Sequence, residues 1–435
     1  VADMLRQAGV IRTDTVEELF DVASLLANQS LPRGRRVAIV TNAGGPGILA
    51  ADACEANGLQ IAQLSETTAK QLRDFLPAAA SIGNPIDMIA SATPEHYARA
   101  LRAVLVDPQV DSVIAIYIPV LPTDAPDIAA VIRETAQYSQ GKTIVATFMG
   151  AQGVPVGLAP VPSFPFPERA VTALARAAKY AEWRAKPVGH VAEFSDIDAP
   201  AVRAIVEKKI EGGGAWLDPI ETRDLLRAAG IPMAPLELAS DCEEASDAAL
   251  RLDFPVAVKA AGPLHKSDVG GVKLGLQTVA AVRDAVDEMQ ERLGSAMSGV
   301  VVQKMVPRGV ELMLGASADP SFGHLIGVGS GGTLVEVLAD IAFRIHPLTD
   351  SDADEMLQQV RVSRLIDGVR GAKAADRGAI RNAIERISAL VGICPEIREL
   401  DINPLIALPD GVVAVDARVR VEALQPGPPS RRVSY

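Results

Sequence analysis

The sequence predicts an α/β protein in two parts, a doubly wound α/β domain followed by an α+β domain. In the first part, short apolar runs typical of buried strands alternate with segments of helical periodicity. From about residue 201, strand-like runs come in pairs with helices set between the pairs. Apolar residues make up 49% of the chain but aromatic residues only 4%, which suits parallel strands covered by helices. We place the domains at 1–186 and 201–435, with a linker at 187–200.

The first domain is expected to open with a helix over residues 13–27, because Thr15 and Glu18 have the spacing of a capping box. An apolar strand follows at 36–42. A glycine turn then leads into a helix over 43–58 that closes at Asn-Gly. The remaining elements alternate in the same way, with strands at 111–120 and 143–150 and helices near 94–106, 125–139 and 168–184.

The second domain is expected to begin with a helix over residues 218–230. Asp218 is a good capping residue, Pro219 suits the first helical position, and Gly230 suits the stop. Further elements are strands at 255–261 and 272–279, helices at 280–294 and 376–391, and a last hairpin that includes IRELDINPLIAL and GVVAVDARVRV.

The charge and cysteine content exclude several classes of function. The formal net charge is −12 and no basic block offsets it, so neither nucleic acid nor an anionic membrane is expected as the main partner. The three cysteines are far apart and lack metal-ligand spacing, which is typical of reduced thiols in a cytoplasmic protein. No apolar run approaches the ~20 residues of a membrane span.

The run IRELDINPL contains a candidate metal site. Glu399, Asp401 and Asn403 alternate with apolar residues, so the three polar side chains share one face of a strand. If a two-residue turn lies at 409–410, Asp416 on the returning strand lies opposite Asn403, about 5 Å away at Cβ. Mg²⁺ takes carboxylate and amide oxygens together with substrate phosphates. The alternative is a solvated sheet face, and a slip of one residue in register would break the pairing.

Three charged residues are candidates for binding a polyphosphate. Lys259 ends an apolar strand, where its ammonium group can reach a phosphate as a point charge. The alternative is a lysine whose stem lies along the strand edge while its charge stays in water. Glu311 lies between two strand-like runs, three residues after Arg308, and its position alone does not identify a nucleotide site. Arg344 is open to two interpretations, a second phosphate cation or a surface ion pair.

The segment GPLHKSDVGG at 262–271 connects two predicted strands and places His265 beside a lysine. A glycine-rich loop between paired strands is one way to hold a polyphosphate. We therefore regard His265 as a candidate functional residue, with a plain surface turn as the alternative.

A second glycine-rich turn lies in the first domain. Gly44, Gly45 and Gly47 stand between a predicted strand and a helix, where free N–H groups and the positive end of the helix dipole can face an anion. The segment lacks both the Gly-Lys-Ser/Thr of a Walker loop and the G-x-G-x-x-G dinucleotide fingerprint. It therefore suits a transient phosphate or a phosphorylated side chain, and a structural glycine turn is the alternative.

Together these motifs resemble the NDP-forming acyl-CoA synthetases, which are relatives of succinyl-CoA synthetase. In the first domain, QAGVIR, VAIVTNAGGPGILAADACEANGL and GNPIDM resemble the flavodoxin-like ligase domain of that family. The second domain resembles its ATP-grasp half through GIPMAPLELAS, FPVAVKA, LHKSDVGGVKLGL, VVVQKMVPRGVELMLG, FGHLIGVGSGG, LVEVLAD, FRIHPL, ELDINPL and AVDARV. The series covers nearly the whole chain in the right order, which is more specific than any single motif.

The resemblance implies a role for each candidate residue. In the nucleotide site, Lys259 would hold phosphates, the backbone from Gln303 through Lys304 and Met305 to Val306 would read adenine, and Glu311 and Arg344 would complete the pocket. Asn403 and Asp416 would bind Mg²⁺, Asp401 would orient a phosphohistidine beside the nucleotide, and His265 would match a second histidine of the phosphate relay. The helix at Gly44, Gly45 and Gly47 would be one of two that cradle the phosphohistidine.

The reaction implied is acyl-CoA + ADP + phosphate ⇌ carboxylate + CoA + ATP, through an acyl phosphate and a phosphohistidine. Its cofactors would be Mg²⁺ and ATP/ADP, with CoA as co-substrate. In the family, a CoA-binding domain and a Ser-His-Thr-Gly carrier segment precede the QAGVIR-like helix, and neither is in this sequence. We expect them on a missing segment or a partner subunit, in a homo-oligomer or in a complex with a CoA-binding domain.

Two alternatives belong to other classes. One is the acyl-CoA-sensing, synthetase-like portion of a protein lysine acetyltransferase, which has lost catalytic activity. The candidate site residues argue against this loss, since all of them are present: Lys259, His265, Asp401, Asn403 and Asp416. The other is a different ATP-grasp carboxylate ligase, which the flavodoxin-like first half disfavours.

Overall fold

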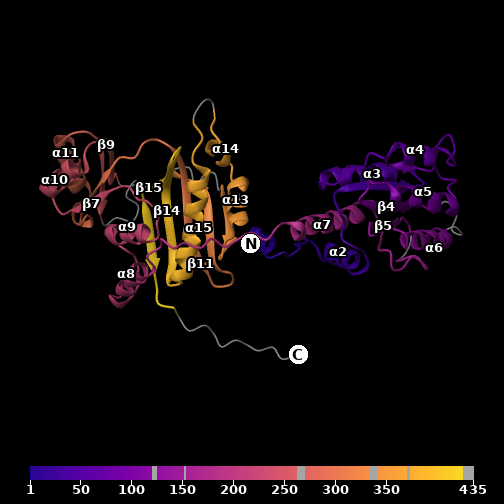
Figure 1. Ribbon diagram of the computed structural model, residues 1–435, viewed down its shortest axis with the longest axis horizontal. Helices are drawn as coiled ribbons and strands as arrows, with labels where there is room; N and C mark the ends of the chain where they lie inside the picture. Colours follow the sequence, from indigo (N-terminus) through magenta and orange to yellow (C-terminus); the bar gives the residue numbers. More distant parts are fainter. Residues whose placement is uncertain (120–124, 151–152, 262–269, 333–339, 370–372, 425–435) are drawn as a thin grey trace. The chain divides into compact units, whose positions relative to one another are not determined.

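The structure is a computed structural model of residues 1–435, and it describes residues 1–119, 125–150, 153–261, 270–332, 340–369 and 373–424. The chain divides into two compact units, Met4–Pro187 and Val188–Tyr435 (Figure 1). Within the described ranges, no helix combines the length and the apolar character that crossing a lipid bilayer requires.

The first unit is built on a six-stranded sheet in which all strands pair in parallel, in the order β2-β1-β4-β5-β6 with β3 also on β1. The strands are β1 (Arg36–Thr41), β2 (Gln60–Ile61), β3 (Ile86–Asp87), β4 (Ser112–Tyr117), β5 (Thr143–Phe148) and β6 (Ser163–Phe164). Every residue of β4 and β5 is buried. This burial on both faces explains why these strands read as continuous apolar runs.

Helices cover both faces of this sheet, so the predicted doubly wound architecture is confirmed. On β1, Ile39 packs in a cluster with α2, α3 and α7, and its neighbour Val40 packs in a second cluster with α5 and α6. The helices are α1 (Ala2–Gln7), α2 (Val16–Asn28), α3 (Gly44–Ala56), α4 (Glu66–Arg73), α5 (Pro94–Val106), α6 (Ala125–Ala136) and α7 (Pro167–Ala185).

The second unit contains two antiparallel sheets, as the predicted α+β plan requires. The smaller has the order β7-β10-β8-β9, and the larger the order β13-β12-β11-β14-β15, with β16 also on β14. The smaller sheet comprises β7 (Leu236–Ala239), β8 (Val256–Ala261), β9 (Val272–Leu276) and β10 (Gly299–Lys304). The larger comprises β11 (Val310–Asp319), β12 (Gly323–Ser330), β13 (Ile341–Ile345), β14 (Ile397–Leu408), β15 (Gly411–Ala414) and β16 (Ala417–Val421).

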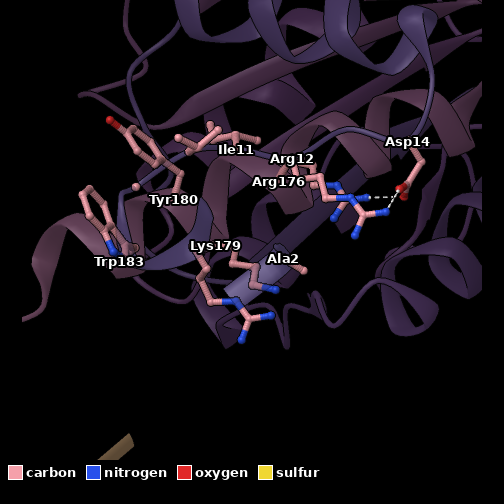
Figure 2. Close-up of a pocket in the computed structure, with 11 residues that line it drawn as sticks. Ala2, Ile11, Arg12, Asp14, Arg176, Lys179, Tyr180 and Trp183 are labelled. Atoms are coloured by element: carbon pink, nitrogen blue, oxygen red, sulfur yellow. Dashed lines mark hydrogen bonds and ion pairs between the residues drawn. The ribbon is translucent and has the colours of Figure 1, made fainter. Parts of the chain in front are cut away.

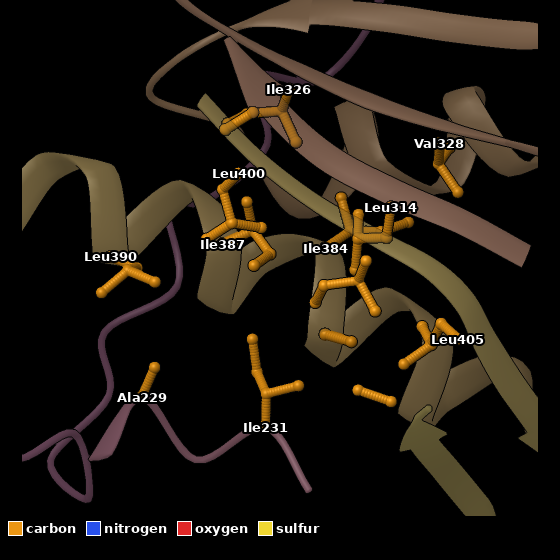
Figure 3. Packing of buried hydrophobic residues seen from close by; sticks show 14 of the residues in the cluster. Ala229, Ile231, Leu314, Ile326, Val328, Ile384, Ile387, Leu390, Leu400 and Leu405 are labelled. Carbon is orange, nitrogen blue, oxygen red and sulfur yellow. The ribbon is translucent and has the colours of Figure 1, made fainter. Parts of the chain in front are cut away.

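Each sheet of this unit buries one face under helices. α10 and α11 pack on the smaller sheet, while α15 lies along the larger one, where Ile384 and Ile387 meet Leu314 and Leu400 (Figure 3). The helices are α8 (Ala199–Glu211), α9 (Pro219–Ala228), α10 (Cys242–Leu252), α11 (Val279–Leu293), α13 (Asp350–Gln359), α14 (Ser363–Ile366) and α15 (Arg377–Ile393), with a 3-10 turn at Gly294–Ala296. Asp218 caps α9 as predicted, accepting from the N–H groups of its first turn.

The segment that precedes α8 is anchored to the second unit. The N–H of His190 donates to Asp350 Oδ1 at 2.9 Å, and the N–H of Asp350 donates to the His190 carbonyl at 2.9 Å. Further along, Arg386 of α15 pairs with Asp196 at 2.7 Å and stacks over Phe194, with 4.3 Å to the ring centroid. The predicted linker, residues 187–200, is therefore bound to the second unit from residue 190 onward.

The last hairpin has the predicted turn and register. Leu408 pairs with Gly411 across the turn, and the same register continues from β15 into β16, where Asp401 pairs with Arg418. Asn403 lies opposite Asp416, since its N–H donates to the Asp416 carbonyl at 3.0 Å. Leu400 and Ile402 are buried between the polar residues, so Asp401 and Asn403 lie on the opposite face from the core.

Candidate functional site

A cleft of about 710 Å³ in the second unit brings together several of the predicted site residues. It is lined by one face of β7, β8 and β10, by residues 415–418, and by Trp216 and the start of α9. Lys259, Gln303 and Asp416 all line it, although they lie far apart in the sequence.

Lys259 is directed into this cleft by the alternation of β8. Its neighbours Val258 and Ala260 are buried in the cluster formed with α10 and α11, so the lysine side chain lies on the other face of the sheet. Lys259 is only 7% exposed, and its ammonium group donates to the Val415 carbonyl at 3.1 Å. This contact holds the cation beside the peptide of Asp416.

Asp401 lies in a partly buried and charged environment. Burial raises the pKa of its carboxyl group; Arg418 opposes this shift, while Asp416 and Glu399 add to it. Such a carboxyl group holds a proton more readily than an exposed aspartate does, which is typical of functional sites.

A pair of glycines links Asn403 to Glu311. The N–H of Gly332 donates to Asn403 Oδ1 at 2.9 Å, and the N–H of Gly331 donates to the Glu311 carbonyl at 2.9 Å. A Cβ atom on Gly332 would overlap the carboxylate of Glu311. Because they lack side chains, the two glycines can lie close to Glu311 and Asn403, which belong to the neighbouring strands β11 and β14.

The segment from Gln303 to Val306 leaves the end of β10. Gln303 is 1% exposed and donates to the Ala234 carbonyl at 3.3 Å. The Lys304 ammonium group donates to the carbonyls of Asp253 and Phe254 at 2.8 and 3.2 Å. The N–H groups of Lys304 and Met305 donate to backbone carbonyls of residues 235 and 255. Hydrogen bonds from its backbone and its side chains thus hold this segment in place.

Arg344 is not among the residues that line the cleft. Its side chain is 3% exposed, and its guanidinium group meets Glu355 at 3.3 Å and Gln359 at 3.1 Å, both on α13. Of the two interpretations that the sequence allowed, the structure shows an ion pair, in which the arginine is buried and the Glu355 side chain is 35% exposed.

His265 lies outside the described residues. The strands on either side of its segment are described, and β8 pairs with β9 with Lys259 opposite Val272. The 262–271 segment is therefore attached at the end of the strand that carries Lys259.

The glycines of the first unit open α3, as predicted. Ala43 precedes the helix and provides no side-chain cap, so the N–H groups of the first turn are left to other acceptors. Gly47 is buried, and a Cβ atom there would press on Thr41 and Pro85, so it is a packing residue. Gly44 lies next to the carboxylate of Asp87, and a Cβ atom at Gly45 would meet open space.

Two features of the site were not identified from the sequence. Arg418 could have been found, because the register that pairs Asn403 with Asp416 also pairs Asp401 with Arg418. The contact between Gly332 and Asn403 could not have been predicted, because the two residues are 71 positions apart in the sequence. The glycine pair at 331–332 was the only sequence feature that pointed to it.

Comparisons with known proteins identify the two domains and the family. Residues 37–159 match the Ligase-CoA domain and residues 208–421 match the ATP-grasp domain. The acetate–CoA ligase (ADP-forming) I subunit beta of Pyrococcus furiosus is 34% identical over 50% of this chain and 96% of that relative. The chain belongs to the ADP-forming acyl-CoA ligase family. The resemblance seen in the motifs is thereby confirmed.

The family relatives include longer proteins. The acetate–CoA ligase (ADP-forming) I of Archaeoglobus fulgidus is 38% identical over 95% of this chain and 61% of that relative. The chain thus spans about three fifths of the length of the curated relatives it matches. A solved acetyl-coenzyme A synthetase 1 of Ca. Korarchaeum cryptofilum in complex with coenzyme A is 37% identical over 50% of this chain and 99% of that chain, with a TM-score of 0.48.

Proposed function

We propose that this chain is the ligase and nucleotide-binding part of an ADP-forming acyl-CoA synthetase, which converts acyl-CoA, ADP and phosphate reversibly into a carboxylate, CoA and ATP. The observation that carries the proposal is the cleft that Lys259 and Asp416 both line, with Lys259 held by the carbonyl next to Asp416. Membership of the family and the order of the two domains support it.

The proposed reaction has three steps. A phosphate oxygen attacks the thioester carbonyl, and the CoA thiolate leaves to give an acyl phosphate. A histidine nitrogen then takes the phosphoryl group, and the carboxylate leaves. Finally a terminal oxygen of ADP takes the phosphoryl group from the histidine to give ATP. Imidazole suits the carrier role because it is a neutral nucleophile near pH 7.

In the nucleotide site, Lys259 would hold the phosphates and Glu311 would lie in the pocket. Since the N–H groups of Lys304 and Met305 are already used by backbone carbonyls, Val306 would provide the backbone N–H donor to adenine, and carbonyl groups of the segment would accept from it. Gln303 would support this segment through its bond to Ala234. Arg344 would act indirectly, by fastening β13 to α13.

Asn403 and Asp416 would hold Mg²⁺, and their oxygens suit a hard cation. No three His, Cys, Asp or Glu side chains of the described ranges come together as a metal site, so two protein ligands would be completed by phosphates and water. The ion, when bound, would neutralise the phosphoryl group in transfer. Asp401, on the same strand face as Asn403, would orient the phosphohistidine.

His265, on the segment attached to the Lys259 strand, would act in the phosphate relay. The start of α3, with Gly44, Gly45 and Gly47, would receive the phosphohistidine in the first unit. The carrier histidine and the CoA-binding domain would be supplied by the rest of the protein or by a partner subunit.

The test uses the two tryptophans of the chain. Trp216 lines the cleft and Trp183 lies in the first unit, so Trp183→Phe leaves Trp216 as the only indole reporter. Titration with ATP and Mg²⁺ should give a saturable change in fluorescence. Asp416→Ala should remove the part of the affinity that depends on Mg²⁺, whereas Asp410→Ala, at the exposed turn of the same hairpin, should not.

Equal affinity for MgATP in the Asp416→Ala and Asp410→Ala variants would remove Asp416 from the metal site. In the complete protein, His265→Ala should still bind nucleotide but should fail to transfer phosphate. Normal turnover by that variant would reduce His265 to a loop residue.

A further inference from the structure

A second pocket, of about 180 Å³, lies in the first unit away from the glycine turn of α3. One side is formed by α1 and the segment after it, and the other side by α7. The lining residues are Ala2, Arg6, Gly9, Val10, Ile11, Arg12, Asp14, Arg176, Lys179, Tyr180 and Trp183 (Figure 2). The pocket therefore joins two segments that are more than 150 positions apart in the sequence.

One end of the pocket is a network of ion pairs. Asp14 meets both Arg12 and Arg176 at 3.2 Å, as Figure 2 shows, and Arg176 also donates to Glu18 at 2.6 Å. Arg176 is thus held by two carboxylates, while the Arg12–Asp14 pair is about 60% exposed on both sides. The planar guanidinium group of Arg12 keeps further N–H donors that suit an oxyanion.

The middle of the pocket carries more positive charge. Lys179 lies between the ion pairs and the aromatic rings in Figure 2, and Arg6 also lines this pocket. The pKa of Lys179 is lowered, first by partial burial and then by Arg6, Arg176 and Arg35, and Glu182 offsets this only in part. Arg6 and Arg176 therefore add positive charge near Lys179, which suits an anionic ligand.

The other end of the pocket is aromatic. The rings of Tyr180 and Trp183 stack with centroids 5.7 Å apart and planes 14° apart. Gly9 has a φ of +71°, and a Cβ atom there would overlap the Trp183 ring, so the glycine packs directly on the indole. Val10 is 50% exposed beside these rings. This end offers a flat apolar wall a short distance from the cations.

We propose that this pocket binds a small organic phosphate, with its phosphoryl group at Arg6, Arg12 and Lys179 and its apolar body against Tyr180 and Trp183. Dianionic phosphate suits a group of arginine and lysine donors. A flat body gains from the aromatic wall. A compact phosphomonoester carries both groups. The site is separate from the nucleotide cleft, which belongs to the second unit.

The test follows the fluorescence of Trp183 in the full chain carrying Trp216→Phe, which leaves Trp183 as the only tryptophan. Phenyl phosphate is the probe, inorganic phosphate tests the anion alone, and benzyl alcohol tests the ring alone. Phenyl phosphate should give a saturable change and bind about 2- to 10-fold more tightly than inorganic phosphate, since the aromatic wall adds to the affinity. Benzyl alcohol should give no saturable change.

Lys179→Met and Arg6→Met should each weaken the binding of phenyl phosphate about tenfold or more, because each removes a charge-assisted contact. Arg184→Met is the matched control, since Arg184 lies exposed on the same helix outside the pocket. Lys259→Met should leave the Trp183 response unchanged, which separates this site from the phosphate chemistry of the proposed function.

The proposal is overturned if phenyl phosphate gives no saturable change, or if Lys179→Met and Arg6→Met bind it as tightly as Arg184→Met does. It is also overturned if inorganic phosphate binds as tightly as phenyl phosphate, because the aromatic wall would then have no role. Thermal unfolding of each variant shows that the fold is intact, and either cation variant alone suffices for the comparison.

Discussion

Replacement of Gly332 by alanine should weaken both the fold and the binding of nucleotide. Gly332 has a φ of +75°, and its added Cβ atom would displace the carboxylate of Glu311. Gly323 offers a matched control, because its φ is +77° and a Cβ atom there meets open space. Both alanines carry the same backbone strain, but only the one at 332 disturbs the candidate site.

The magnitudes follow from these two effects. A left-handed conformation costs a non-glycine residue about 1–2 kcal/mol, so each variant should unfold about 2–8 °C lower in a unit of this size. The Glu311 side chain can rotate away, so the overlap adds little to the loss of stability. Loss of a hydrogen bond from Glu311 to the nucleotide would cost about 1.5–3 kcal/mol, which corresponds to about 10- to 150-fold in affinity.

The assay is thermal unfolding of the wild type, Gly332→Ala and Gly323→Ala, with and without ATP and Mg²⁺. The two variants should have similar melting temperatures without ligand, and only Gly323→Ala should keep the stabilisation by MgATP. If MgATP stabilises both variants equally, then Glu311 does not belong to the nucleotide site.

Three further outcomes are expected. Arg386→Ala should lower the free energy of unfolding by about 2–4 kcal/mol, because the Ala229 carbonyl loses its donor and a stacked guanidinium is lost. Urea unfolding measures this against Arg381→Ala, which removes an arginine of the same helix whose side chain is 43% exposed, and equal losses would refute it. The raised pKa of Asp401 means that the folded chain binds its proton more tightly than the unfolded chain does, so stability falls as pH rises from the ordinary value of 3.8 through the raised one. Asp401→Asn should therefore be more stable than the wild type at pH 7 but not at pH 3.5, and a constant difference at both pH values would contradict this. A thiol reagent at pH 8 should label Cys242 alone in the folded chain, since burial raises the pKa of Cys54 to about 12 and that of Cys394 to about 11. Mass spectrometry locates the label, and label on Cys54 or Cys394 would count against their burial.

Much of the fold was predictable because local signals agreed with the tertiary structure. Asp218 and Pro219 fix the start of α9, and helix α5 has the predicted bounds because proline opens it. The turn at 409–410 sets the register of the last hairpin, and hence the opposition of Asn403 and Asp416. In each case the determinants lie within a few residues of one another.

The rest depends on contacts between distant segments, which a single sequence does not encode locally. The two interpretations of Arg344 differ only in whether α13 packs beside β13, as it does. Lys259 is held by the carbonyl of Val415, 156 positions away. The pocket at Lys179 and Trp183 needs a glycine and cations from α1 and the following loop. None of these pairings follows from periodicity or spacing.

The anchoring of residues 190–198 leaves only a short joint between the units. Helix α7 ends at Ala185 and the first anchoring bond is at His190, while Val188 between them is 90% exposed. A protease should therefore cut first within residues 186–188, which are all exposed. Each of the two fragments would keep its own hydrophobic core.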